Sequence, residues 1–338
     1  MNKNRPVSLK DLALELGVSI STVSRALKNS SEVSSEMKAK VKALAKKRNY
    51  RPNPFAMSLL KNSPRLIGII VPDIVTHFYA SIISGINDVA RKNNYSIIIT
   101  SSYEQYELEK QCLDDLINIR VEGIIACLSQ DTVEFSHFET VFNQNIPLVF
   151  FDRVCLTDKF SSVITDNVES AQKATAHFIE NGSRRVGFIG GANHLEIVKQ
   201  RKHGYLEALR DHKIPIEKEL VVCKKIGYNE GYEGAHQLLS LSEPPNAILA
   251  MTDSIAFGAM KAIKEYGLQI PDDVSIIGYT DEEHSNYVEP TLTAVTHQTY
   301  KMGEEACKLL LKHLKGDEDI KQVVIPALLS VRHSTKKE

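Results

Sequence analysis

The stretch Val18-Ser19-Ile20-Ser21-Thr22-Val23-Ser24-Arg25-Ala26-Leu27 has the pattern of a short amphipathic helix that starts after a turn. Gly17 ends the segment before it, and Ser19 is a good N-cap because its hydroxyl can accept a hydrogen bond from a backbone N–H of the first turn. Three residues form its inner face: Val23, Ala26 and Leu27. A helix, a tight turn and a second helix are the arrangement that lets the second helix enter the major groove of DNA.

Two more amphipathic segments flank this helix. The apolar residues of the first share one helical face: Leu9, Leu12, Ala13 and Leu16. Ser8 precedes that segment and Asp11 follows three residues later, which is a capping-box start. The segment after the central helix begins near Ser34 and has its own inner face: Met37, Val41, Leu44 and Ala45. Residues 8–47 are therefore predicted to form three short helices.

The charge of the chain is unevenly distributed. Over all 338 residues the net charge is −1, but residues 1–63 hold 13 Lys and Arg against 4 Asp and Glu, a net of +9. The remaining residues hold 28 against 38, a net of −10. A basic module for a polyanion, joined to a mildly acidic globular body, accounts for this asymmetry.

The outer face of the central helix carries hydroxyls and one arginine. Hydroxyls and backbone N–H groups at a helix N-terminus suit phosphate oxygens, and Arg25 can form two hydrogen bonds to guanine O6 and N7. Ile20 can contact a thymine methyl group. The alternative is a small helical domain with a solvated charged face, and the net charge of +9 favours DNA binding instead.

From residue 65 onward, short apolar runs alternate with amphipathic segments. Near-continuous β-branched runs are typical of strands buried on both faces, and they are Leu66–Val71, Ser96–Thr100, Gly123–Cys127, Leu148–Phe151, Val186–Gly190, Ile248–Met251 and Val274–Gly278. Helices fit the intervals 79–92, 104–119, 169–181, 196–212, 229–241, 254–266 and 300–315. This alternation predicts an α/β body of doubly wound parallel sheets, and its length of about 270 residues favours two lobes.

Polar residues follow the predicted strands directly: Asp73, Asp152-Arg153, Gly190-Gly191, Thr252-Asp253 and Thr280-Asp281. In open α/β sheets ligands bind outside the carboxyl ends of the strands, so two facing lobes would place these groups around one cleft. For any single aspartate the alternative role is a helix N-cap, as for Asp253.

Several classes of protein do not fit the sequence. Dinucleotide, phosphate-loop, zinc-protease and serine-hydrolase motifs are absent, and the histidines lack metal-ligand spacing, so we expect neither an enzyme nor a metal or cofactor. The longest apolar run, Leu66–Pro72, is far shorter than the ~20 residues that span a bilayer. Without an apolar signal segment, the five widely spaced cysteines predict reduced thiols and a cytoplasmic protein.

Residues 18–27, followed by Tyr50-Arg51-Pro52-Asn53 and Ala56-Met57-Ser58-Leu59, resemble the lactose/galactose/purine repressor (LacI/GalR) family. The resemblance runs over essentially the whole chain, with further matches at Asp166-Asn167, Gly182, Arg201-x-x-Gly204-Tyr205, Thr252-Asp253, Gly258 and Pro290-x-Leu292-Thr293. It implies a transcription regulator, in the first place a repressor, whose DNA affinity responds to a small molecule. The implied parts are a helix-turn-helix domain (1–50), a hinge helix with linker (51–64) and a periplasmic-binding-protein-like core (65–338). The two implied lobes cover about 65–162 with 293–324 and about 163–290 with 325–338.

The resemblance implies a set of DNA-contacting residues: Ser8, Ser19, Ile20, Ser21, Thr22, Ser24, Arg25, Lys28, Asn29, Tyr50, Arg51, Asn53, Ala56 and Leu59. Leu59 stands where the family's hinge helix wedges a leucine into the minor groove, and such a wedge kinks the duplex. Two positions depart from the family pattern. Leu60 replaces a usual Lys or Arg, and Lys28 replaces a common Asn.

The resemblance also implies a set of effector contacts between the lobes: Phe78, Tyr79, Asp152, Arg201, Tyr228, Thr252, Asp253 and Thr280. Aromatic faces and an Arg–Asp pair suit a sugar, so a carbohydrate or a derivative is favoured over a purine base. Thr280 stands where an aspartate commonly holds the effector, and Thr76-His77 replaces an Asn-Pro pair.

The resemblance also implies two partners, a palindromic double-stranded operator and a second copy of the chain, and a two-fold DNA site matches a two-fold dimer. A secreted sugar-binding protein of the same fold is the alternative, but it would have no use for the basic module. The effector's identity, the direction of its effect and the choice between dimer and tetramer stay open at this point.

Overall fold

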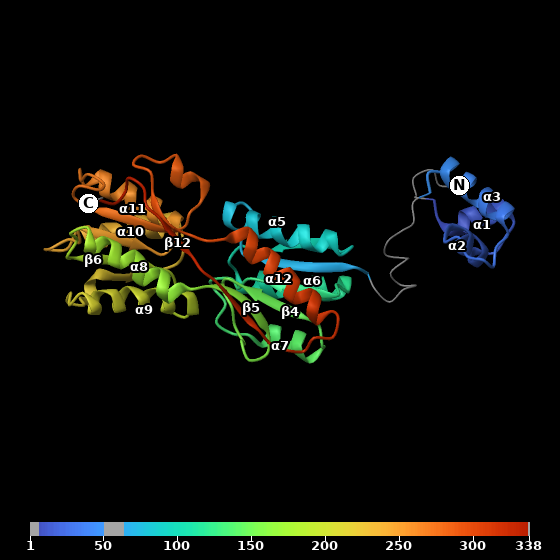
Figure 1. The fold of residues 1–338 in the computed structure, drawn as a ribbon, viewed down its shortest axis with the longest axis horizontal. Helices are drawn as coiled ribbons and strands as arrows, with labels where there is room; N and C mark the ends of the chain where they lie inside the picture. Colours follow the sequence, from blue (N-terminus) through green and yellow to red (C-terminus); the bar gives the residue numbers. More distant parts are fainter. Residues whose placement is uncertain (1–6, 51–63, 337–338) are drawn as a thin grey trace. The chain divides into compact units, whose positions relative to one another are not determined.

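The computed structural model describes residues 7–50 and 64–336, and the chain divides into two compact units between Pro64 and Arg65 (Figure 1). The units are described one at a time. The predicted hinge residues Arg51, Asn53, Ala56 and Leu59 lie outside the described residues.

The N-terminal unit contains the three predicted helices, α1 (Leu9–Leu16), α2 (Ile20–Leu27) and α3 (Ser35–Lys47). The capping box is present, since Asp11 N donates to Ser8 Oγ at 3.3 Å and Ser8 N donates to Asp11 Oδ2 at 2.9 Å. Gly17 has φ = 66°, a left-handed conformation that glycine adopts without strain and that ends α1 tightly. A small apolar core joins the helices: Leu12, Ala13, Val23, Ala26, Val33, Val41 and Ala45.

Residues 64–336 form two six-stranded sheets, each with helices on both faces. The first lobe has the strand order β11-β5-β4-β3-β1-β2, with β1 Leu66–Val71, β2 Ser96–Ser101, β3 Gly123–Ala126, β4 Leu148–Phe151, β5 Ser161–Thr165 and β11 Gln322–Ile325. The second has the order β12-β10-β9-β8-β6-β7, with β6 Val186–Gly190, β7 Val221–Cys223, β8 Ala247–Ala250, β9 Ser275–Thr280, β10 Thr293–Thr296 and β12 Leu328–Ser330. The strand pairs are parallel except β10 with β12, so the predicted fold class is confirmed.

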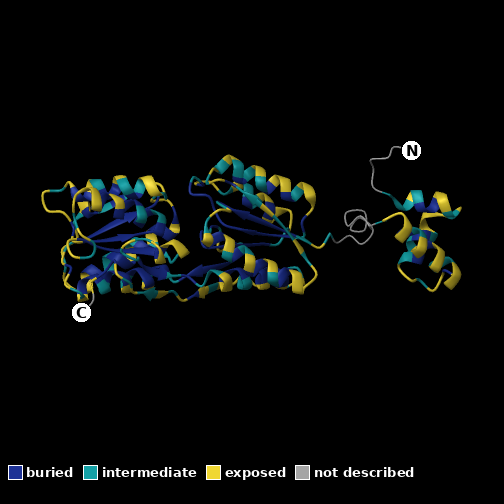
Figure 2. Cartoon of the chain, turned by 90° about the horizontal axis from the view of Figure 1, so that it is seen from above, coloured by how far each residue is buried: buried dark blue, intermediate teal, exposed yellow. Residues whose placement is uncertain are grey.

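Helix pairs cover the two faces of each sheet, and the central strands between them are buried (Figure 2). In the first lobe, α5 (His77–Lys92) and α12 (Thr299–His313) pack on one face, and α6 (Tyr106–Ile119) and α7 (Ser136–Asn143) on the other. In the second, α10 (Tyr228–Leu239) and α11 (Asp253–Glu265) cover one face, and α8 (Asn167–Glu180) and α9 (Glu196–Asp211) the other. Each predicted helix and strand of this body lies within two residues of an observed one at both ends.

The lobe boundaries differ from the predicted ones. The chain first crosses between lobes after β5, so residues 163–165 belong to the first sheet and not to the second. It crosses back after β10, which pairs with β9, so residues 293–296 belong to the second sheet and not to the first. The third crossing lies between β11 and β12. The apolar pattern could not place these crossings, because β5 reads Ser-Ser-Val-Ile-Thr and β10 reads Thr-Ala-Val-Thr.

Glycines allow the paired helices to approach closely. A Cβ added at Gly258 of α11 would overlap the carbonyl oxygen of Tyr228 on α10, and one added at Gly231 of α10 would overlap the carbonyl oxygen of Ile255 on α11. The α5–α12 pair in the first lobe meets in the same way at Gly85 and Gly303. Since the neighbouring atoms are backbone, a side chain there forces the helices apart.

Gly258→Ala should therefore destabilise the protein. Overpacking of this kind costs up to about 3 kcal/mol, and the better helix propensity of alanine returns about 1 kcal/mol. The net loss of about 2 kcal/mol should lower the melting temperature by about 4–8 °C in calorimetry. Gln237→Ala, at an exposed position of α10, is the matched control and should change the melting temperature little. Equal stability of the two variants would contradict the close helix contact.

Candidate functional site

The exposed face of α2 carries most of the predicted DNA contacts. Ser19 caps the helix by accepting a hydrogen bond from Thr22 N at 3.1 Å, and its hydroxyl also lies 2.7 Å from that of Ser21. Ile20 is 48% exposed and is not part of the apolar core of its own unit. Ser24 is half-buried, whereas Arg25 and Lys28 are exposed. Helix α2 thus presents hydroxyls, one apolar side chain and two cations to solvent.

The remaining described members of the predicted DNA set lie around α2. Ser8 is the N-cap of α1, and Tyr50 packs half-buried against the small core. Asn29 adopts φ = 58° and its side-chain oxygen accepts a hydrogen bond from Lys42 Nζ at 2.6 Å.

Arg25 has a partner that the sequence analysis did not identify. Its Nη1 lies 3.0 Å from Glu32 Oε2, and both side chains are more than half exposed. An exposed ion pair of this kind contributes between nothing and about 1 kcal/mol, so it can be exchanged for a guanine or a phosphate at little cost. The pair holds the guanidinium beside the outer face of α2.

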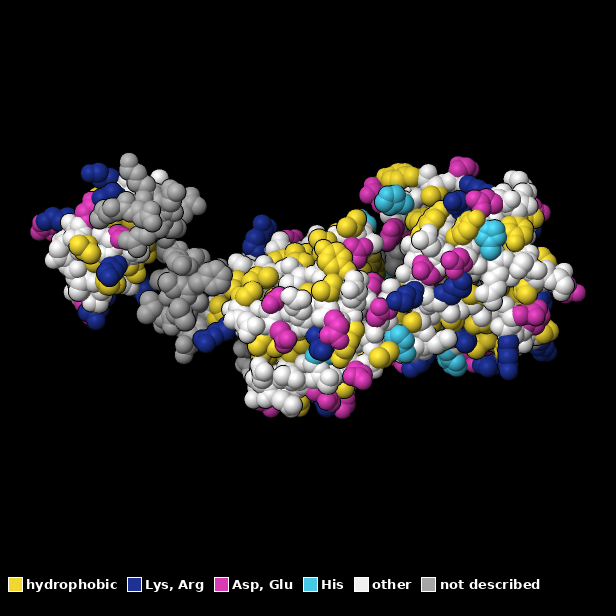
Figure 3. All heavy atoms as spheres, turned by 180° about the vertical axis from the view of Figure 1, so that it is seen from behind, with side chains coloured by type: hydrophobic (Ala, Val, Ile, Leu, Met, Phe, Trp, Pro, Cys, Tyr) yellow, Lys and Arg dark blue, Asp and Glu magenta, His cyan; other side chains and the backbone are white. Residues whose placement is uncertain are grey.

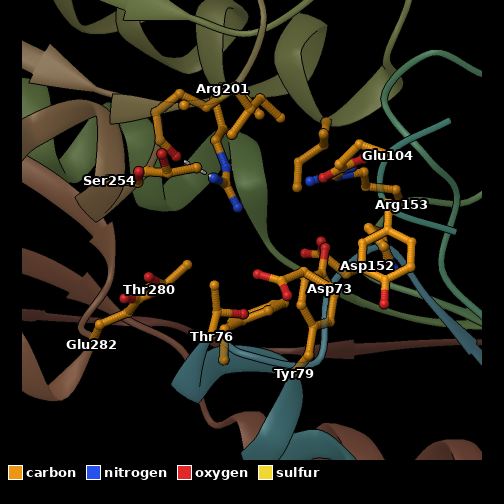
Figure 4. A pocket seen from close by; sticks show the side chains of 18 residues that line it. Asp73, Thr76, Tyr79, Glu104, Asp152, Arg153, Arg201, Ser254, Thr280 and Glu282 are labelled. Carbon is orange, nitrogen blue, oxygen red and sulfur yellow. Dashed lines mark hydrogen bonds and ion pairs between the residues drawn. The ribbon is translucent and has the colours of Figure 1, made fainter. Parts of the chain in front are cut away.

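A cavity of about 350 Å³ lies between the two lobes of residues 64–336 (Figure 4). Six of the eight predicted effector contacts line it: Phe78, Tyr79, Asp152, Arg201, Thr252 and Thr280. They come from the carboxyl ends of β4, β8 and β9, from the first turn of α5 and from the second turn of α9, close to the strand ends where α/β sheets bind ligands. The cavity is about the size of a small-molecule site.

Arg201 projects into the cavity from α9 and is only 2% exposed. Its Nε donates to Asn167 Oδ1 at 2.9 Å and its Nη1 donates to the carbonyl oxygen of Met251 at 2.6 Å. The guanidinium also lies 4.1 Å from the ring centre of Tyr279, a cation–π contact. Burial lowers the pKa of Arg201 somewhat, but these three contacts fix the charged group in one orientation. Its Nη2 is left to meet a ligand.

Asp152 faces Arg201 from the other lobe. Burial raises the pKa of this carboxyl, while the nearby guanidinium groups of Arg201 and Arg153 oppose that rise. The residue adopts φ = 57°, a left-handed conformation in which aspartate is enriched among non-glycine residues. Thr280 has φ = 103°, a strained value for a β-branched residue. Strain of this kind concentrates at ligand sites, because the surrounding structure must enforce it.

A second charged pair lies on the first-lobe wall. Arg153 Nη1 lies 2.7 Å from Glu104 Oε2, and the same oxygen accepts a hydrogen bond from Gln130 N at 2.6 Å. Arg153 follows Asp152 after β4, which is a strand-end signal that the sequence displayed. Glu104 lies in the turn after β2, where Tyr103 and Glu104 both have positive φ, and sequence reasoning missed it.

Two predicted effector residues do not line the cavity. Tyr228 is 43% exposed at the start of α10, and its neighbour Gly227 lines the cavity instead. Asp253 is fully buried behind the wall, where its Oδ2 accepts hydrogen bonds from Glu282 N at 2.6 Å and from Thr280 Oγ1 at 3.2 Å. Burial raises the pKa of Asp253 to about 8. Asp253 therefore positions the wall that carries Thr280 and does not reach the cavity itself.

The structure adds lining residues that the predicted set lacked: Pro72, Asp73, Thr76, Tyr103, Glu104, Arg153, Ile197, Ile226, Gly227, Met251, Ser254 and Glu282. Asp73 follows β1 and was visible as a polar residue at a strand end. Ser254 and Glu282 each follow directly after a predicted strand-end pair, Thr252-Asp253 and Thr280-Asp281. A search for polar residues one turn further past each strand end would have found both.

Direct contacts join the two lobes beside the cavity. The loop after β3 reaches the second lobe, where the Gln130 side-chain oxygen accepts a hydrogen bond from Ile226 N at 2.7 Å. The backbone oxygen of Gln130 lies 2.8 Å from His194 Nε2, and Asp131 Oδ1 lies 2.7 Å from Lys225 Nζ. We call Gln130, Asp131, His194, Lys225 and Ile226 the interlobe latch.

The buried carboxylate of Glu109 anchors the first-lobe side of this latch. It accepts hydrogen bonds from Ser129 N at 2.6 Å and from Thr132 Oγ1 at 2.8 Å, on either side of Gln130 and Asp131. The loop that carries the latch is therefore held rigidly by its own lobe.

Other kinds of site find no support in the described part of the chain. No group of three or more His, Cys, Asp and Glu residues there could hold a metal ion, and none of the described helices is long and apolar enough to cross a membrane. The five cysteines are unpaired.

Comparison with known proteins gives two matching family models and close full-length relatives. Residues 8–53 match the model of bacterial regulatory proteins of the lacI family, and residues 175–335 match a periplasmic binding protein-like domain. Catabolite control protein A of Priestia megaterium is 32% identical over 336 residues, which cover 98% of this chain and 99% of that protein.

Two solved structures cover almost the whole chain as well. The lac repressor dimer bound to operator and the anti-inducer ONPF superposes with a TM-score of 0.84 at 26% identity, covering 98% of this chain and 99% of that one. The complex of the transcriptional regulator CelR with cellobiose gives a TM-score of 0.75 at 25% identity, covering 98% and 100%.

These relatives are transcription regulators and not enzymes, and they match both the helix-turn-helix unit and the two-lobed body. The chain therefore belongs to the LacI family of bacterial transcription regulators and is a DNA-binding repressor-type protein that responds to a small molecule.

Proposed function

We propose that this protein is a cytoplasmic homodimeric repressor of a palindromic operator, controlled by a carbohydrate that binds in the cavity between the two lobes. The observation that carries the proposal is the construction of that cavity. Its walls come from both lobes, and it opposes a fixed guanidinium on one lobe to a buried carboxyl on the other. A ligand that contacts both favours one relative position of the lobes.

The lining suits a polyhydroxylated ligand. The rings of Phe78 and Tyr79 meet edge to face, with 5.0 Å between their centres. They form an apolar surface of the cavity against which the C–H faces of a sugar can pack. Arg201, Asp152, Thr252 and Thr280 supply donors and acceptors for hydroxyls. The similar CelR structure is a complex with cellobiose, which supports a sugar as the ligand of this protein.

A second copy of the chain is the proposed dimer partner. Strand β2 is an edge of the first sheet, and its residues Ile97, Ile98 and Ile99 are half-buried or exposed within one protomer. Unpaired apolar edges of this kind are usually covered. Figure 3 shows hydrophobic side chains gathered on one face of the first lobe. The lac repressor structure, which is similar along 98% of this chain, is a dimer bound to operator.

The interlobe latch gives the effector a way to act at a distance. Glu104 lines the cavity and accepts a hydrogen bond from Gln130 N, so a ligand that contacts Glu104 bears on the residue that bridges the lobes. Typical coupling between two sites amounts to about 1–3 kcal/mol, and contacts of this strength can supply it.

The DNA-binding part of the proposal is tested by selecting binding sites from a random library of double-stranded fragments. The selected sequence should be two-fold symmetric, with half-site centres about 34–36 Å apart. Arg25→Ala should lose preference at one base pair in each half-site, by about 1–3 kcal/mol. The exposed Lys28→Ala, as the matched control, should weaken binding uniformly across sequences. An asymmetric site, or an unchanged preference in Arg25→Ala, would contradict the assignment.

The latch is tested by calorimetric titration of the best-binding sugar. Gln130→Ala removes the acceptor for Ile226 N, and loss of one hydrogen bond should raise the dissociation constant about three- to tenfold. Lys225→Ala should have a smaller effect because the pair that it breaks is exposed.

Lys224→Ala is the matched control for the latch. Lys224 forms its ion pair with Glu233 inside the second lobe and should leave the affinity unchanged. The latch is disproved as a closing contact if Gln130→Ala binds the sugar as tightly as Lys224→Ala does.

A further inference from the structure

The cavity contains more acidic than basic groups. Four carboxyl side chains line it, Asp73, Glu104, Asp152 and Glu282, whereas the cationic side chains in the lining are those of Arg153 and Arg201. No lysine or histidine is among the lining residues in the described part of the chain. These charges do not all act on a ligand, because some of the carboxylates and arginines form ion pairs with one another.

Glu104 and Arg153 cancel locally. Their side chains meet at 2.7 Å, and the Glu104 oxygen is also bound by Gln130 N. A ligand therefore encounters Asp73, Asp152 and Glu282 with Arg201 as the one cation not already in an ion pair among the lining residues. This leaves two negative charges in excess.

Part of the hydrogen-bonding capacity of Arg201 is used within its own lobe. Two of its nitrogens already donate to Asn167 and Met251, and its face is occupied by the Tyr279 ring. The side-on pairing of a carboxylate or phosphate with Nε and a terminal nitrogen is therefore already taken, while the terminal nitrogens keep N–H groups for a ligand. One N–H-bearing nitrogen remains, and its neighbour across the cavity is the carboxyl of Asp152.

Asp152 presents a buried carboxyl to the cavity. Its side chain is 92% buried, given 8% exposure, lines the cavity, and has no hydrogen-bond partner among the described residues. A buried carboxyl in that position is costly unless a donor meets it. A hydroxyl or an ammonium group can donate to this carboxyl, whereas a carboxylate or phosphate anion cannot.

Asp73 and Glu282 extend this preference across the cavity. Asp73 lies after β1 in the first lobe and Glu282 lies after β9 in the second. Burial raises the pKa of Glu282, the charges of His284 and His77 oppose that rise, and the charge of Asp73 adds to it. One oxygen of Asp73 accepts a hydrogen bond from Val75 N at 2.8 Å, which leaves the other for a ligand. Glu282 is held in place because its backbone N–H donates to the buried Asp253.

We propose that the cavity selects an effector without negative charge, a neutral or ammonium-bearing polyhydroxylated molecule, and that Asp73 and Glu282 set this selectivity against phosphorylated and carboxylated counterparts. The inference rests on the proposed function of the cavity as a carbohydrate site. Hydroxyl or ammonium groups can donate hydrogen bonds to both carboxylates and so join the lobes, whereas a phosphate or carboxylate is repelled by them in a partly water-excluded space.

The test compares sugars that share one skeleton and differ in charge, by thermal shift on the full-length protein. Each set contains the neutral sugar, its amino derivative, its phosphate and its uronic acid, in the glucose, galactose and mannose series, with ribose and ribose 5-phosphate added. We expect shifts from neutral or amino members and none from the phosphate or uronate of the same series. A larger shift from an anionic member than from its neutral counterpart overturns the charge proposal while leaving the carbohydrate site in place. If no compound shifts the melting temperature, both the charge proposal and the carbohydrate site fall.

Variants then assign the selectivity to residues. The double variant Asp73→Asn with Glu282→Gln removes the carboxylates that repel a phosphate. The ratio of the dissociation constants of the sugar phosphate and of the neutral sugar, measured by calorimetry, should fall by about tenfold or more. Glu283→Gln, an exposed neighbour outside the cavity, is the matched control and should leave the ratio unchanged. If the ratio of the two dissociation constants is the same in the double variant as in Glu283→Gln, the assignment of the selectivity to Asp73 and Glu282 is overturned.

Discussion

The burial of charge between the two lobes is the constraint on which the rest of the structure depends. A guanidinium that is 2% exposed must be held by its surroundings, and Arg201 is held by Asn167, the Met251 carbonyl and the Tyr279 ring, with Nη2 left to meet a ligand. These three partners come from α8, the end of β8 and β9, so a single side chain fixes the relation of three elements of the second lobe. Asp152 on the first lobe then faces a charge that is already oriented. Pre-organisation of this kind means that a ligand gains contacts without paying to order the groups that make them.

The two lobes themselves are rigid enough to transmit a change in their relative position. Each sheet is clamped between helix pairs, and the pairs α10–α11 and α5–α12 approach through glycines to backbone contact. Glu109 holds the latch loop from inside the first lobe, and Asp253 holds the Thr280–Glu282 wall from inside the second. Movement is therefore expected at the three crossings between lobes and at the latch, where few contacts join the two bodies.

Much of this could be read from the sequence, and the failures have physical causes. Long β-branched runs identified the central strands, and Gly17 with Ser19 identified the turn before α2, because backbone geometry ties these residue types to those conformations. The strands β5 and β10 and the lobe crossings that follow them were missed, since both strands are rich in Ser and Thr and carry no continuous apolar run. At the cavity, strand-end position identified Asp73 and Arg153 as candidates. It did not distinguish Asp253, which points behind the wall, from Glu282, which reaches the cavity, because that depends on a turn with positive φ at Thr280 and Asp281.

The central claim is that the cavity and the DNA-binding unit are thermodynamically coupled, and reciprocity tests it most directly. For one operator fragment and one sugar, four dissociation constants are measured by titration: each ligand alone and each in the presence of a saturating amount of the other. The account predicts that the sugar changes operator affinity by the same factor by which the operator changes sugar affinity, a factor of about 5–150. Independent binding of the two, with both factors equal to one, would contradict it.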